Sequence, residues 1–264
     1  TIIKYRITKI TVSKKFYINM RSSYRPWKRI LNLFIATRNF FCYSIPMDQE
    51  LLALRNHARF LGIALDDHQL ALFNVYKNEL LQWNTKTNLI SENSSHEIIT
   101  RHFLDSLTAL RFIPQTGCKM MDVGCGAGFP GIPLKIAQPD FKLFLLEANR
   151  KKVSFLKNIL RLLDLKQSVV LHERVEDIIK TVTWKESVDV VISRATFSLS
   201  ELFRLGDLLL IPGGDVIAFK GPDVDPEIQD LFSGKNRGKF SQLIQHDIKA
   251  DFSDATRKII IIKK

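Results

Sequence analysis

The sequence predicts an α/β protein with a mostly parallel sheet of seven strands, an amino-terminal helical cap and a closing antiparallel hairpin. Three observations support this prediction. Short apolar segments are interspersed with helical segments from residue 119 to residue 232. A glycine-rich loop follows the first of these apolar segments. The last two apolar segments, 240–248 and 256–262, are joined by a short polar loop, so they must pair as antiparallel neighbours.

The segment 119–134 combines a buried strand, a glycine loop and the start of a helix. Gly124, Gly126 and Gly128 follow the strand at alternate positions, where the chain must turn sharply and let a ligand lie against bare backbone. Pro133 lies just inside the helix, where its missing N–H is not needed. Such loops serve dinucleotides, flavins and S-adenosylmethionine, and a glycine turn without a ligand is the simpler alternative.

Residues 47–115 are expected to form the helical cap, and residues 116–264 the ligand-binding core. Apolar residues at helical spacing and start signals define the elements of the cap. Helices are predicted over 48–61, over 66–83 and, after a polar turn at 84–89, from a capping box at Ser94 and Glu97 onward.

The apolar stripe of the third predicted helix leaves Arg101, Asp105 and Thr108 on the surface. Arg101 and Asp105 are four residues apart, and an ion pair along the helix is the usual meaning of that spacing. The alternative is that both face a substrate. His102 is expected to be a half-buried packing residue, or else a catalyst.

Polar residues follow the later strands of the predicted sheet, at the edge where ligands of open α/β sheets bind. Glu147 ends the strand 141–146 and lies 23 residues after Gly124, where a carboxylate can accept hydrogen bonds from both hydroxyls of a ribose. A polar turn with Val175 and Glu176 follows the next strand and is placed to touch an adenine. The following two strands deliver Arg194 and Lys220, respectively. A guanidinium at the end of a central strand is expected to meet an anion or a base.

The net charge of +12 is concentrated at the amino terminus. Residues 1–46 hold ten Lys or Arg and no acid, whereas the other 218 residues hold 29 basic and 27 acidic residues, a difference of +2. The basic segment is therefore expected to be no domain of its own. It resembles an organellar transit peptide, a basic arm for RNA phosphates, or translated sequence upstream of a start at Met47, and we favour the last.

The three cysteines, Cys42, Cys118 and Cys125, lack the spacing of a disulfide framework or a zinc site. We therefore expect no metal and a reducing compartment. No apolar run reaches the roughly 18 residues of a membrane span, so no membrane partner is expected.

Seven groups of residues from Met47 onward, about four fifths of the chain, carry a resemblance to one family. They are Trp83-Asn84 with Asn88-Leu89; Arg101-His102-x-x-Asp105-Ser106; the run from Asp122 to Leu134 with Gly-Phe-Pro-Gly-Ile-Pro; Lys151-Lys152-x-x-Phe155-Leu156; Arg174-Val175-Glu176; Ile192-Ser193-Arg194-Ala195; and Lys220-Gly221. In this order and spacing the chain resembles the bacterial 16S ribosomal RNA guanine-N7 methyltransferases of type G, also called glucose-inhibited division protein B.

The resemblance implies a Rossmann-like class I fold that binds S-adenosylmethionine and releases S-adenosylhomocysteine. It implies that Gly124 and Phe129 contact the cofactor, that Val175 and Glu176 contact its adenine region, and that Arg194 borders cofactor and substrate. The chain departs from the family at two points. Cys125 stands where a small hydroxyl residue is usual, and Glu147-Ala148 stands where an acid is more often followed by Ser.

The resemblance also implies the reaction, methyl transfer to N7 of a guanosine in 16S ribosomal RNA, free or in the small subunit, in the bacterial cytoplasm. Guanine N7 is nucleophilic without losing a proton, so the reaction needs positioning rather than a general base. Arg194 and Lys220 would position the base or its phosphates, and Asp105 would hydrogen-bond the guanine edge. Other acceptors, a nicotinamide-dependent oxidoreductase, a non-catalytic RNA-binding module, and organelle import through residues 1–46 are the alternatives.

Overall fold

The order of the strands places the glycine loop at the centre of a seven-stranded sheet. The computed structural model describes residues 49–91, 95–194, 196–233, 239–248 and 256–264. The basic segment 1–46 with the proposed start at Met47, the capping serine Ser94, and the loop 250–255 of the terminal hairpin lie outside these residues.

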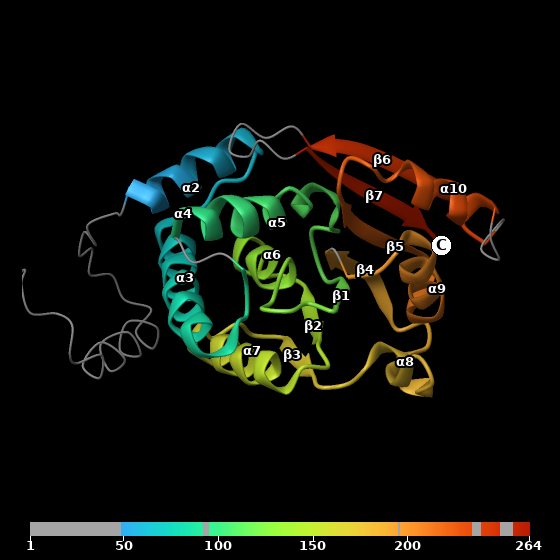
Figure 1. Ribbon diagram of the computed structural model, residues 1–264, viewed down its shortest axis with the longest axis horizontal. Coiled ribbons are helices and arrows are strands. Elements are labelled where there is room, and N and C mark those ends of the chain that lie inside the picture. The colour runs from blue at the N-terminus through green and yellow to red at the C-terminus, as the bar shows by residue number, and fades with distance from the viewer. Residues whose placement is uncertain (1–48, 92–94, 195, 234–238, 249–255) are drawn as a thin grey trace, which may run out of the picture. The chain divides into compact units, whose positions relative to one another are not determined.

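The sheet has the order β3-β2-β1-β4-β5-β7-β6. β1 to β5 run parallel, and β7 is antiparallel to both β5 and β6. The predicted mostly parallel sheet with a closing antiparallel pair is therefore confirmed (Figure 1). The strands are β1 (Lys119–Val123), β2 (Lys142–Leu146), β3 (Ser168–Leu171), β4 (Val188–Arg194), β5 (Leu210–Lys220), β6 (Gln242–Ile248) and β7 (Arg257–Lys263).

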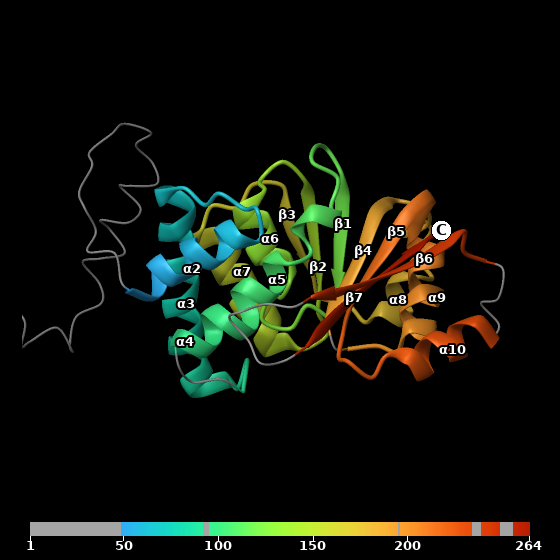
Figure 2. The same ribbon diagram turned by 90° about the horizontal axis from the view of Figure 1, so that it is seen from above.

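Helices cover both faces of the sheet and enclose two apolar cores. One core joins α2, α3, α6 and α7 to alternate residues of the strands, and the other joins α8, α9 and α10 to the residues between them. Figure 2 shows the two groups of helices on opposite sides of the strands. The helices are α2 (Gln49–Phe60), α3 (Asp67–Thr87), α6 (Gly131–Ala137), α7 (Arg150–Leu162), α8 (Val175–Ile178), α9 (Leu199–Leu209) and α10 (Asp225–Ser233).

The helix α3 is longer than its sequence predicts. A capping box starts it, because Asp66 accepts from the backbone of Gln69 and Gln69 accepts from the backbone of Asp66. The helix then continues through the predicted polar turn to Thr87. Asn84 is buried there and accepts a hydrogen bond from the backbone of Ile90, which fixes the following loop instead of ending the helix.

The third predicted helix is irregular. It consists of α4 (Ser95–Glu97), a π-helical segment over 98–104 and α5 (Asp105–Leu107). A π-helical turn is wider than an α-helical turn, so it rotates the residues that follow. Asp105 and Thr108 are consequently buried, and the prediction that they lie on the surface is wrong.

The helix α9 has no counterpart among the predicted elements. It follows β4 and is held by Ser198, whose side chain accepts from the backbone of Glu201. The expected boundary between residues 115 and 116 stays a prediction. Ile113 and Cys118, which lie on either side of it, pack in the same core.

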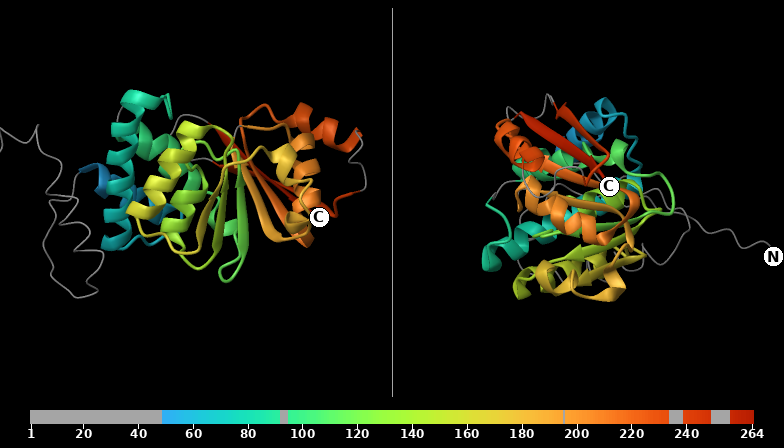
Figure 3. Two further views of the ribbon diagram at one scale, coloured as in Figure 1. Left: turned by 90° about the horizontal axis from the view of Figure 1, so that it is seen from below. Right: turned by 90° about the vertical axis from the view of Figure 1, so that its right-hand side faces the viewer.

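The arrangement of the strands locates the candidate site. The strand order reverses between β1 and β4, and the glycine loop leaves the carboxyl end of β1 at that point. Ligands of open α/β sheets bind beyond the carboxyl ends of the strands where the order reverses. The strands fan out in the twist that is usual for such a sheet (Figure 3). None of the helices in the described ranges combines the length and the apolar character of a membrane span.

Candidate active site

The end of β2 fixes the glycine loop from one side. Gly124 N and Cys125 N both donate to the carbonyl oxygen of Leu146, at 2.9 and 3.2 Å. Gly126 N donates to Glu147 Oε2 at 2.9 Å, and Asn149 N donates to Glu147 Oε1 at 2.8 Å. Glu147 is thus placed at the expected strand end. Each of its oxygens already accepts one backbone hydrogen bond and retains capacity for another.

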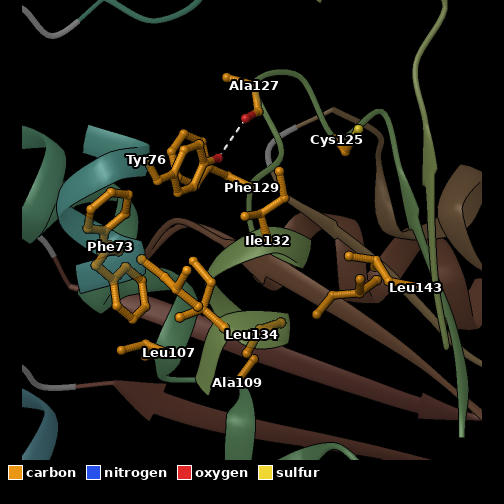
Figure 4. Packing of buried hydrophobic residues seen from close by; sticks show 14 of the residues in the cluster. Phe73, Tyr76, Leu107, Ala109, Cys125, Ala127, Phe129, Ile132, Leu134 and Leu143 are labelled. Carbon is orange, nitrogen blue, oxygen red and sulfur yellow. Dashed lines mark hydrogen bonds between the residues drawn. The ribbon is translucent and has the colours of Figure 1, made fainter. Parts of the chain in front are cut away.

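Tyr76 of α3 fixes the loop from the other side. Its hydroxyl donates to the carbonyl oxygen of Ala127 at 2.6 Å (Figure 4). Its ring stacks on Phe129 and Phe103. Burial raises the pKa of Tyr76 well above its ordinary value, so the hydroxyl keeps the proton that it donates. A helix of the cap therefore holds the loop of the core in place.

The three glycines of the loop differ in what a side chain at each position would contact. A Cβ on Gly124 would lie 2.7 Å from Cγ2 of Thr196, and a Cβ on Gly128 would overlap the side chain of Ile132 and lie 3.0 Å from the hydroxyl oxygen of Tyr76. These two positions are closed by the chain's own side chains. Among the described residues, a Cβ on Gly126 would have Lys152 Nζ, at 3.9 Å, as its one neighbour within 4 Å. Gly126 alone presents backbone toward open space.

The guanidinium of Arg194, at the end of β4, gathers residues from the irregular helix. Its Nη1 donates to the carbonyl oxygen of Arg101 at 3.0 Å and to Asp105 Oδ2 at 3.2 Å. Its Nη2 lies 2.7 Å from His102 Nδ1, and its Cζ lies 5.1 Å from the ring centre of Phe129. Arginine only donates hydrogen bonds, so Nδ1 of His102 is the acceptor of this one. The sequence therefore places Arg194 correctly at the end of this strand, and its contact with the cap is a finding of the structure.

Asp105 connects this group to the last strand. Its Oδ1 lies 3.4 Å from Nε of Arg257, the first residue of β7, while Oδ2 accepts from Arg194. Its carboxylate is buried and faces two arginines of the core. Asp105 therefore pairs with Arg194 and Arg257, and not with Arg101 along the helix as expected. Sequence reasoning missed Arg257, since only the antiparallel direction of β7 brings its first residue to this edge.

Lys220 lies at the end of β5 as expected, but its ammonium is engaged inside the protein. It donates to the carbonyl oxygen of Phe197 at 2.6 Å and to Glu227 Oε2 at 2.7 Å. Glu227 also accepts from the backbone of Leu199, so the three residues tie β5 to α9 and α10. The structure thus gives Lys220 partners within the protein, and its expected contact with RNA stays a prediction.

The predicted adenine contacts differ in exposure. Val175 is buried in the second core at the start of α8, whereas Glu176 is exposed. Arg101 is also exposed. Phe129 is buried among Tyr76, His102 and Phe103, so a ligand beside this loop would meet its backbone.

Cys118 and Cys125 are buried free thiols. Burial raises the pKa of Cys118 to about 11 and that of Cys125 well above its ordinary value, so both thiols keep their protons. Their role is packing. Within the described ranges, His, Cys, Asp and Glu side chains do not gather in threes suited to a metal ion.

Asp122, at the end of β1, is a buried carboxyl group that sequence reasoning left out of the site. Its Oδ2 accepts from Gly131 N at 2.7 Å, and its Oδ1 has no hydrogen-bond partner among the described residues. Burial raises the pKa of Asp122 to about 7, against the opposing effects of the Gly131 hydrogen bond and of Arg194, and Glu147 adds to the rise. Asp122 therefore offers a buried acceptor directly below the loop.

Comparisons with known proteins identify the family of this chain. The family model described as rRNA small subunit methyltransferase G, GidB, matches residues 69–256. A ribosomal RNA small subunit methyltransferase G of Syntrophus aciditrophicus is 46% identical over 170 residues, which are 64% of this chain and 70% of the relative. That of Alkaliphilus metalliredigens is 36% identical over 218 residues, which are 82% of this chain and 91% of the relative. The chain belongs to this family.

Solved structures show the fold that the family membership implies. A protein of Agrobacterium tumefaciens described as a predicted O-methyltransferase has a TM-score of 0.51 at 21% identity, over 61% of this chain and 80% of its own. The [4+2]-cyclase SpnF has a TM-score of 0.50 at 14% identity, over 63% of this chain and 79% of its own. One fold thus carries different reactions, so it is the membership in the methyltransferase G family that identifies the enzyme class. The prediction of an S-adenosylmethionine-dependent methyltransferase is confirmed, and the oxidoreductase alternative is excluded.

The residues around the loop fit S-adenosylmethionine. Gly126 leaves room over the backbone, Glu147 has acceptor capacity for the ribose hydroxyls, and Asp122 Oδ1 is an acceptor without a partner among the described residues. Acceptors of this kind suit the hydroxyl and ammonium donors of the cofactor. Direct contacts with the cofactor stay predictions. The residues predicted to make them are Gly124, Gly126, Gly128, Phe129, Glu147, Val175, Glu176 and Arg194.

The two kinds of glycine in the loop predict opposite responses to alanine. Gly126→Ala should lower the affinity for S-adenosylhomocysteine at least tenfold, because a methyl group occupies the open space, and should cost only about 1 kcal/mol of stability for its positive φ. Gly128→Ala should lower the free energy of unfolding by about 3 kcal/mol, because the methyl overlaps Ile132. Titration calorimetry and urea unfolding measure the two effects, and equal losses in both variants would contradict this division.

The pKa of Asp122 predicts how stability depends on pH. An unfolded aspartate has a pKa of about 4, so between pH 4 and 7 the folded state binds more protons than the unfolded state. The free energy of unfolding should therefore fall as the pH rises from about 4 to about 7, and Asp122→Asn should remove this component. Asp247→Asn, which changes an exposed aspartate of β6, is the control. Parallel pH profiles for wild type and Asp122→Asn would contradict the assignment.

Proposed function

We propose that this chain transfers the methyl group of S-adenosylmethionine to N7 of a guanosine in 16S ribosomal RNA. The observation that carries the proposal is the group around Arg194. It stands next to the glycine loop, and it joins the end of β4 to the buried residues of the irregular helix and to Phe129 of the loop. A cofactor half, formed by the ends of β1, β2 and β3, therefore borders a substrate half formed by β4 and the cap.

When bound, S-adenosylmethionine supplies an electrophilic methyl group. The protein must orient the guanine and does not need to remove a proton from it, because N7 already has a lone pair. The side chains agree with this requirement. Nδ1 of His102 accepts from Arg194, so that lone pair is engaged, and both oxygens of Asp105 face arginines. The group around Arg194 is therefore built to hold a fixed geometry.

The helix α7 supports an RNA substrate. Its first turn contains Arg150, Lys151 and Lys152 and no acidic residue. Cations at a helix amino terminus oppose the helix dipole and cost about 0.3–1 kcal/mol each. Lys152 lies close to Gly126, and Arg150 and Lys151 are exposed, so the unfavourable charges are placed where an anionic substrate would meet them. RNA phosphates are such anions.

Mapping of modified guanosines tests the function. The 16S RNA of a bacterium lacking this gene should have lost one 7-methylguanosine by mass spectrometry, and the purified protein with S-adenosylmethionine should restore it. Both free RNA and assembled small subunits should be offered, which also identifies the form that is methylated. An unchanged pattern of 7-methylguanosine, with methyl incorporation into another acceptor, would overturn the proposal. The bacterial cytoplasm stays the expected location.

The position of Arg194 predicts how its loss affects the reaction. Arg194→Ala should reduce methyl transfer at least a hundredfold and leave the affinity for S-adenosylhomocysteine within about tenfold, because the side chain aligns the substrate half. Single-turnover rates and titration calorimetry measure both. Arg204→Ala, on the exposed side of α9, is the control and should change neither. Equal losses of rate and of cofactor affinity would move Arg194 to the cofactor half.

A further inference from the structure

The direction of β7 brings a second arginine to the edge where the substrate is proposed to bind. The parallel strands reach this edge with their last residues, and β7, being antiparallel, reaches it with its first. In the register of the sheet, Lys258 lies opposite Lys220 at the end of β5, and Arg257 lies one residue beyond it. Arg257 therefore stands next to the end of the parallel sheet.

One buried carboxylate holds this arginine together with Arg194. Asp105 faces Arg257 Nε with Oδ1 at 3.4 Å and Arg194 Nη1 with Oδ2 at 3.2 Å. The side chain of Asp105 is 7% exposed, that of Arg194 is 16% exposed and that of Arg257 is 41% exposed. Two arginines thus share one carboxylate, and the more exposed of the two is Arg257.

We propose that Arg257 binds a phosphate of the ribosomal RNA next to the target guanosine, with Asp105 as the positioning residue that fixes the guanidinium. The inference rests on the proposed function. Arg257 uses Nε toward Asp105, so within the described residues its two terminal nitrogens remain to face a phosphate as a planar pair of donors. Among the described residues, Asp105 is the acidic residue with which Arg257 forms an ion pair.

The anion is an RNA phosphate and not the carboxylate of the cofactor. The features that fit the cofactor, Gly126, Glu147 and Asp122, belong to β1, β2 and the loop between β1 and α6. Two strands, β4 and β5, separate β1 from β7 in the sheet. Arg257 therefore lies on the substrate half, beside Asp105 and Arg194.

The matched comparison uses the two ends of β7. Arg257 and Lys263 are 41% and 39% exposed, and each faces one aspartate, Asp105 and Asp215 respectively. Arg257→Ala and Lys263→Ala thus remove one equally exposed, acid-paired cation from opposite ends of one strand. A general electrostatic effect would be the same in both variants.

The experiment measures binding and methylation of small subunits, and of 16S RNA extracted from them, from a strain lacking the gene. Arg257→Ala should raise the KM for RNA about tenfold, leave the affinity for S-adenosylhomocysteine within twofold, and reduce the slope of log K against log salt by about one. Lys263→Ala should change KM less than twofold. Arg257→Gln, which keeps a donor toward Asp105 and loses the charge, should reproduce the effect if the alanine variant does not fold.

Several outcomes would overturn the assignment. An unchanged KM and salt slope in Arg257→Ala or Arg257→Gln, with an active wild type, shows that the arginine contacts no phosphate. Equal effects of the Arg257 and Lys263 variants indicate non-specific attraction, and a selective loss of S-adenosylhomocysteine affinity would assign Arg257 to the cofactor. A wild-type protein that binds S-adenosylhomocysteine but methylates neither form of RNA would overturn the proposed function itself.

Discussion

The glycine loop after β1 is the constraint on which the site depends. A chain that leaves a buried central strand must turn at once, and here the turn is clamped between the end of β2 and the helix α3. Glu147 and the carbonyl oxygen of Leu146 hold its amide groups, and Tyr76 holds its carbonyl oxygen at Ala127. The loop is therefore held in position by hydrogen bonds within the protein. Rigid positioning suits a reaction whose nucleophile needs no proton removed.

The same clamp makes the helical cap part of the active site. Tyr76 and Phe103 from the cap stack with each other, and Phe129 of the loop contacts both rings. The irregular helix then turns His102 and Asp105 toward Arg194. A regular α-helix over the same residues would direct Asp105 elsewhere, as the expected stripe of apolar residues indicates. π-helical segments are rare and often occur at functional sites, and this one places a carboxylate between two arginines.

Electrostatics divides the edge of the sheet into two halves. Below the loop, Asp122 and Glu147 are buried carboxyl groups, and their neighbourhood suits the donors of a sulfonium cofactor. On the other side, Arg194 and Arg257 outnumber Asp105 and suit an anionic polymer. The opposite preferences of the two halves fit a reaction between a cationic donor and an anionic acceptor.

The sequence by itself determined the strands, the glycine loop, the antiparallel ending and the family, because these follow from local periodicity and from contiguous motifs. It also placed Glu147 and Arg194 correctly at strand ends, since a residue that follows an apolar run must lie at an edge. Only the tertiary structure decided which of these residues meet. Arg257 reaches Asp105 across 152 positions of the chain, and Lys220 turns to Glu227 and the carbonyl oxygen of Phe197. Such contacts depend on which distant strands pair in the sheet, on the rotation of an irregular helix and on packing between distant segments, and none of these is encoded in the spacing of neighbouring residues.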